Sequence, residues 1–66
     1  MKVRFDEAAD ALYIRLDEAP IEESEEVSPG IVLDFDAENR VVGIEMLRVR
    51  ERLPDARMKQ MQFEVA

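Results

Sequence analysis

The fold of this chain is decided by residues 31–47, whose sequence is IVLDFDAENRVVGIEML. Apolar side chains occupy alternate positions before the polar stretch 36–40 and again after it: Ile31, Leu33, Phe35, Val42, Ile44 and Met46. A period of two is typical of half-buried strands. Asn39 is the residue of the polar stretch best able to adopt the left-handed conformation that short hairpin loops need near their end. This stretch therefore predicts a β-hairpin.

The first sixteen residues predict another hairpin of the same design. Its alternating apolar positions are Val3, Phe5, Leu12, Ile14 and Leu16, with a polar loop at residues 6–10. Shifting the chain by 30 residues superposes the two patterns, which duplication and convergence on one hairpin chemistry explain equally well. Both hairpins should present an apolar face of the same spacing to a shared core.

An acidic connection, residues 17–30, joins the two hairpins and carries six carboxylates and no cation. Proline cannot donate to a strand ladder, so Pro20 and Pro29 leave only Glu22 to Val27 able to form a strand. We expect this piece to be a short edge strand whose charges discourage aggregation between sheets.

The last part of the chain, residues 48–66, is a basic tail that holds five of the nine cations: Arg48, Arg50, Arg52, Arg57 and Lys59. Pro54 suits the first turn of a helix, which predicts a short helix from Pro54 to Gln60. Phe63 and Val65 alternate with polar residues and predict a last short strand. One continuous tail helix is the alternative.

Together these elements predict a single domain over residues 1–66, of the α+β class but mainly β. The expected architecture is an antiparallel meander of about five strands built from two hairpins, residues 1–16 and 31–47, with a short C-terminal helix. The predicted core consists of the alternating apolar residues of both hairpins: Val3, Phe5, Leu12, Ile14, Leu16, Ile31, Leu33, Phe35, Val42, Ile44 and Met46.

The composition excludes several classes of function. The 66 residues contain no Cys and no His, which removes disulfides, thiol nucleophiles, imidazole bases and most zinc or haem sites. No apolar run is long enough for a membrane span, and a net charge of −7 argues against nucleic acid and anionic membranes as partners. We therefore expect a cytoplasmic protein that is not an enzyme and needs no cofactor.

A pair of carboxylates offers an alternative function. Asp34 and Asp36 are expected to share a strand face beside a hairpin loop, where they could jointly hold Mg²⁺ or Ca²⁺. Aspartates beside loops more often serve turns. Small-ligand or divalent-cation binding is thus the alternative to an interaction role.

Self-association is the expected source of additional stability, because a chain this short buries only about 60% of the surface that its unfolded form exposes. Several apolar residues occupy the strand positions between those of the core and therefore face the other side of the sheet. Three arginines at a spacing of two would line one strand face and lie near the acidic segment of a partner chain. The predicted homodimer interface comprises Val32, Val41, Leu47, Val49, Arg48, Arg50, Arg52, Met58, Met61 and Phe63.

Three blocks carry a family resemblance: Phe5-Asp6 with residues 10–16 (DALYIRL), residues 25–34 (EEVSPGIVLD) and residues 41–45 (VVGIE). Over residues 1 to about 50 they resemble the small prokaryotic domain of unknown function 2283 family. The resemblance implies a compact, sheet-dominated domain and supplies no activity, catalytic residue or cofactor. Some members are encoded beside toxin-like small proteins, which implies an antitoxin-like or regulatory role. We thus expect a non-catalytic interaction module that self-associates and binds a small protein partner.

Overall fold

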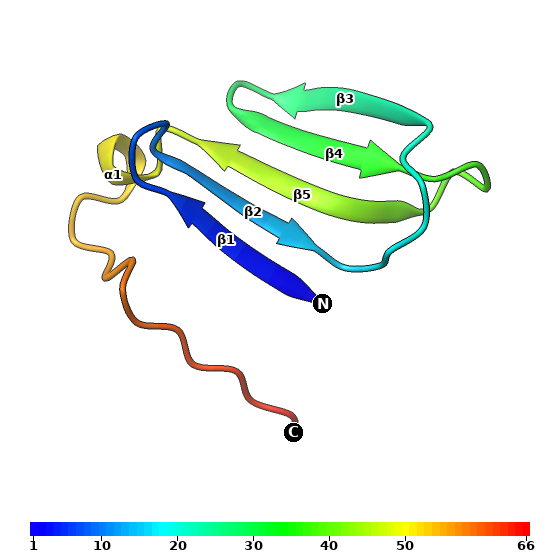
Figure 1. The fold of residues 1–66 in the computed structure, drawn as a ribbon. Coiled ribbons are helices and arrows are strands. Elements are labelled where there is room, and N and C mark those ends of the chain that lie inside the picture. The colour runs from blue at the N-terminus through cyan, green and yellow to red at the C-terminus, as the bar shows by residue number, and fades with distance from the viewer.

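Five antiparallel strands form one sheet in the computed structural model, which describes residues 1–66 (Figure 1). The elements are β1 (Lys2–Asp6), β2 (Ala11–Arg15), β3 (Glu23–Ser28), β4 (Ile31–Phe35), β5 (Val41–Leu47) and the short helix α1 (Val49–Arg52). The expected class, mainly β with one short helix, is confirmed. None of the chain's helical structure is long and apolar enough to cross a membrane.

The strand order across the sheet is β1-β2-β5-β4-β3, which is compatible with a meander of hairpins. Hairpins join β1 to β2, β3 to β4 and β4 to β5, and β2 pairs with β5 at the centre of the sheet. The chain between β2 and β3 runs along one end of the sheet to the far edge, as Figure 1 shows. The acidic strand β3 consequently lies at one edge and β1 at the other.

Residues in the left-handed conformation turn the chain in the hairpin loops. Asn39 has φ 62° in the β4–β5 loop, where the sequence placed it, and Asp10 has φ 54° just before β2. In the β1–β2 loop the carboxylate of Asp6 accepts the backbone N–H of Ala9 at 3.1 Å. Such bonds from Asp side chains to nearby amides stabilise turns.

The register places the predicted core residues on one face of the sheet. Val3 lies opposite Ile14, Ile14 opposite Ile44, and Ile44 opposite Leu33. A second row runs through Phe5, Leu12, Met46 and Ile31. Residues directly opposite in a ladder share a face, and alternate residues of a strand return to it. We call this surface the apolar face, and it comprises Val3, Phe5, Leu12, Ile14, Leu16, Ile31, Leu33, Phe35, Val42, Ile44 and Met46.

The apolar face is not closed within one chain. Of its eleven members only Val42 is buried, at 2% exposed, while Leu16 is 43% exposed and the others are half-buried. Side chains of a single sheet shield one another but need a second layer to leave water completely. The shared face of the predicted core is therefore confirmed along the ladders, up to a register shift between Asp34 and Phe35 that sets Phe35 opposite Val41. The burial of this face within a single copy is not confirmed.

The helix lies earlier in the chain than the sequence predicted. It spans Val49–Arg52, and residues 54–60 contain turns but no helix. The reason is Asp10, whose carbonyl accepts the N–H of Val49 at 3.1 Å and whose carboxylate accepts the N–H of Arg50 at 3.0 Å. Leu47 pairs with Ala11, so the end of β5 arrives beside Asp10, and the chain turns there.

No strand forms at Phe63 and Val65, contrary to prediction, because no neighbouring strand pairs with them. The backbone of the tail is instead held locally, by the N–H of Ala56 on the carbonyl of Leu53 and the N–H of Gln60 on that of Arg57. Figure 1 shows the tail leaving α1 and running on the β1 side of the sheet.

The burial of Val49, which is 1% exposed, makes it the anchor of α1. Val49→Ala removes two buried carbons' worth of packing and should lower the free energy of unfolding by about 2 kcal/mol. Val65→Ala is the matched control, because Val65 is 84% exposed and its truncation should leave stability nearly unchanged. Urea unfolding at one fixed protein concentration measures both, and equal midpoints for the two variants would contradict this placement of Val49.

Candidate functional site

The face opposite the apolar face, here called the polar face, carries a hydrogen-bonded cluster of three side chains. The hydroxyl of Tyr13 donates to Oδ2 of Asp34 at 2.8 Å, and the hydroxyl of Ser24 donates to Oδ1 of the same carboxylate at 2.6 Å. Tyr13 comes from β2, Ser24 from β3 and Asp34 from β4. Asp34 is buried, and both of its oxygens have partners. The cluster therefore ties together strands on both sides of β5.

Gly43 of β5 makes this cluster possible. It lies opposite Arg15 on one side and Asp34 on the other, directly beneath the Tyr13–Asp34 hydrogen bond. A Cβ atom at position 43 would lie 2.6 Å from the Tyr13 oxygen and 2.8 Å from Oδ2 of Asp34. Real Cβ atoms do not approach other heavy atoms so closely, so any side chain here would displace the bonded pair. Glycine is required here for close approach rather than for its backbone freedom.

Arg15 closes the end of the cluster. Its Nη1 lies 3.4 Å from the Tyr13 oxygen, its Nε donates to the carbonyl of Asp17 at 2.6 Å, and its Nη2 donates to the carbonyl of Ala19. The hydrogen bond with Tyr13 is the main cause that raises the pKa of Arg15 above its ordinary value. Arg15 thereby fastens the start of the acidic connection to the end of β2.

Beside the cluster lies a shallow groove of mixed charge. It is lined by Arg4, Asp6, Ala9, Ala11, Tyr13, Asp34 and Glu45. Glu45 is half-buried between Tyr13 on β2 and Val32 on β4. The hydroxyl groups of Tyr13 and Ser24 donate hydrogen bonds to the carboxylate of Asp34. The chemical role of the cluster is therefore to hold the strands in register.

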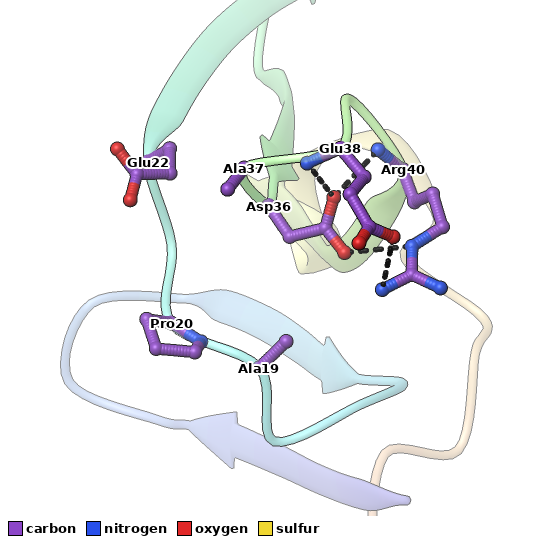
Figure 2. A pocket seen from close by; sticks show the side chains of 7 residues that line it. All are labelled: Ala19, Pro20, Glu22, Asp36, Ala37, Glu38 and Arg40. Carbon is purple, nitrogen blue, oxygen red and sulfur yellow. Dashed lines mark hydrogen bonds and ion pairs between the residues drawn. The ribbon is translucent and has the colours of Figure 1, made fainter.

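Asp36 serves a different purpose from Asp34. It is buried in the β4–β5 loop, where its Oδ1 accepts the backbone N–H groups of Glu38 and Arg40, both at 2.9 Å. Its Oδ2 accepts Nε of Arg40 at 2.8 Å, and Arg40 also pairs with Glu38 at 3.0 Å. Figure 2 shows the carboxylate turned toward Arg40 and the Glu22 side chain pointing away from this group. The backbone hydrogen bond from Arg40 is the main cause that lowers the pKa of Asp36 below 3.8.

The cation site considered at Asp34 and Asp36 finds no support in this geometry. Both oxygens of each carboxylate accept hydrogen bonds within the chain, on the polar face for Asp34 and in the loop for Asp36. No group of three or more acidic side chains converges anywhere in the chain in a way that could hold a metal ion.

The residues predicted for an interface are brought together only in part: Val32 and Leu47 share the polar face, and Met58 and Met61 line one groove. Val49 lies in the chain's own interior and is not free for a partner. The remaining apolar members are spread over β4, β5 and the tail: Val32, Val41, Leu47, Met58, Met61 and Phe63. Among them, Met61 and Phe63 are strongly exposed, at 68% and 66%.

The predicted row of arginines on one strand face is wrong. β5 ends at Leu47, Arg48 adopts φ 55° and a helical turn follows, so the three arginines do not alternate along a strand. The guanidinium groups of Arg48 and Arg52 both lie beside Gly30. Arg50 donates through Nε to Asp10 at 2.9 Å and its guanidinium lies 5.9 Å from the centre of the Phe5 ring. Arg52 donates to the carbonyl of Pro29.

Asp10 is the residue that holds Arg50 in this position, and its role was not foreseen. Burial alone would raise the pKa of Asp10, but hydrogen bonds from the backbone and side chain of Arg50 outweigh it and lower that pKa. Asp10 and Arg50 are 40 residues apart in sequence. Their contact could be predicted only if the pairing of β2 with β5 were known.

Comparison with known proteins identifies a family. A family model described as protein of unknown function (DUF2283) matches residues 2–50, which include all five strands and the start of α1. The chain therefore belongs to the DUF2283 family. No curated protein and no solved structure was found to match it.

Gly43→Ala should lower the free energy of unfolding by about 1 to 3 kcal/mol, the usual range for overpacking, because the new methyl displaces the Tyr13–Asp34 pair. In a Tyr13→Phe background the clash with the hydroxyl is gone, so the same substitution should cost less. Chemical unfolding of the two single variants and of the double variant measures the coupling free energy between positions 43 and 13. Strictly additive costs would show that the two residues do not compete for this space.

The lowered pKa of Asp36 predicts a specific loss of stability in acid. The unfolded chain binds a proton here at higher pH than the folded chain does, so this contribution is present above about pH 4 and is lost as pH falls through the folded pKa. Asp36→Asn should make the free energy of unfolding less dependent on pH between about pH 4 and pH 2. Glu7→Gln, at an exposed loop carboxylate, is the matched control for the removal of one negative charge.

Proposed function

We propose that this member of the DUF2283 family is a non-catalytic interaction module that self-associates through its apolar face. One observation carries the proposal. The chain exposes 5240 Å², about 900 Å² more than the roughly 4300 Å² expected for a compact monomer of 7.6 kDa. Each partner in a standard protein interface buries about 800 Å². The excess is therefore the size of one side of an ordinary dimer interface.

Exposed apolar side chains are found on the apolar face and in the tail. Ten of the eleven apolar-face residues retain contact with water, and Met61, Phe63 and Val65 are strongly exposed. Tail residues 56–61 line one groove together with Val3, Phe5, Leu12 and Ile14, so the tail lies along the β1–β2 half of the face. None of the residues that line this groove comes from β5, β4 or β3, and we call the half of the face formed by those strands the open half. Contiguous apolar surface of this kind marks interaction sites.

A second copy of the chain is the occupant that this surface fits best. Two such sheets packed face to face, about 10 Å apart, would cover each other's apolar residues as in a β-sandwich. A two-fold pair uses the same patch on both copies, so one open face explains both sides of the interface. The polar face is less suited, because its central groups already bond to one another.

The proposal also includes a cellular location and a protein partner. We place the homodimer in the cytoplasm of a prokaryotic cell, which agrees with the composition and with the family resemblance. A small basic protein is the proposed further partner, supported by the net charge of −7 and by the exposed carboxylates of β3. An antitoxin-like or regulatory role would follow from such a partner.

Neighbouring residues of β4 provide the test, because Leu33 lies on the apolar face and Val32 on the polar face while both are half-buried. Wild-type protein should sediment as a dimer at micromolar concentration, and Leu33→Glu should shift it to monomer because a charge would be buried between the sheets. Val32→Glu is the matched control and should remain dimeric.

Circular dichroism establishes that both variants keep the sheet. A wild-type protein that sediments as a single chain would overturn the proposal, as would dissociation by Val32→Glu and not by Leu33→Glu.

A further inference from the structure

Two sets of opposite charge lie at opposite edges of the apolar face. Glu23 and Glu25 of the edge strand β3 share that face, because they lie opposite Phe35 and Leu33 of β4. At the other edge Arg57 and Lys59 line the groove between the tail and strands β1 and β2. All four residues are exposed. We call Glu23 and Glu25 the acidic edge and Arg57 and Lys59 the basic edge.

Neither set is neutralised within the chain. The four ion pairs of the molecule join Arg4 to Asp6, Arg40 to Asp36 and to Glu38, and Arg50 to Asp10. β1 and β3 are separated by four strand spacings, or about 19 Å at roughly 4.8 Å each. Salt screens exposed charges beyond about 8 Å at physiological ionic strength. The two edges of one copy are therefore too far apart to pair with each other.

A second copy can bring the two edges together, in one of two symmetric arrangements. A two-fold axis parallel to the strands places the β1 edge of one sheet over the β3 edge of the other. An axis across the strands places like edges over each other. The first arrangement pairs acid with base at both edges, and the second sets acid against acid and base against base, which is unfavourable.

We infer that the homodimer has its two-fold axis parallel to the strands, with the acidic edge of each copy against the basic edge of its partner. This inference rests on the proposed self-association through the apolar face and specifies how the copies are oriented. The same arrangement sets each tail, which lies on its own β1–β2 half, against the partner's open half. Charge and shape thus select the same orientation.

Charge reversal at each edge tests the inference. Glu23→Lys with Glu25→Lys makes both edges basic, and Arg57→Glu with Lys59→Glu makes both edges acidic. Each variant alone should dimerise at least about tenfold more weakly than wild type, since like charges then oppose each other. An equimolar mixture of the two variants should form a heterodimer, because both contacts then join opposite charges. One chain carrying all four substitutions should dimerise like wild type.

Sedimentation equilibrium of each variant, of the mixture and of the fourfold variant provides the measurement, and circular dichroism establishes that each chain is folded. Wild type that dimerises while both reversals leave its dissociation constant unchanged would overturn the charge-directed orientation but not the proposed function. Weakened variants whose mixture stays as weak as its components would also overturn it. A monomeric wild type would overturn both proposals.

Discussion

The hydrogen bond from Tyr13 to Asp34 crosses β5 above Gly43, and much of the molecule depends on it. It links the two hairpins across the central strand, and Ser24 extends the link to the edge strand β3. A carboxylate that is buried with both oxygens bonded fixes the register of these strands, because a slip of one residue would move Asp34 to the apolar face unpaired. The polar face is thereby occupied by its own contacts.

With the polar face occupied, the apolar face determines how the protein can behave. Within residues 1–66 the segments that follow the sheet are α1 and a short tail. α1 is held at one end of the sheet by Asp10, so it covers only the corner where Val49 is buried. The tail reaches one half of the face. Most of the apolar side chains therefore retain contact with water, and the argument for association starts from that exposure.

The alternating apolar residues were sufficient to predict both hairpins and the shared face, because a period of two is a local property of the chain. The left-handed conformation of Asn39 could also be predicted, because it depends on the residue type and on its place in a short loop. The cluster of Tyr13, Ser24 and Asp34 could not be predicted, since it depends on which strands become neighbours. The position of α1 also escaped prediction, because the local preference of Pro54 for a helix start was outweighed by the contacts of Asp10 with Val49 and Arg50. Which half of the apolar face the tail contacts could not be predicted either, because it depends on how far the tail extends over the sheet.

The placement of the acidic and basic edges on one face has a consequence for the size of the assembly. In a two-fold pair of the inferred orientation, each acidic edge and each basic edge is used once, and the apolar faces are covered. Neither copy then offers a matching surface to a third chain, so growth ends at two. A head-to-tail contact of the same edges would instead leave one acidic and one basic end free and would extend into a filament. In the inferred pair, the acidic and basic edges thus prevent further chains from adding to the dimer.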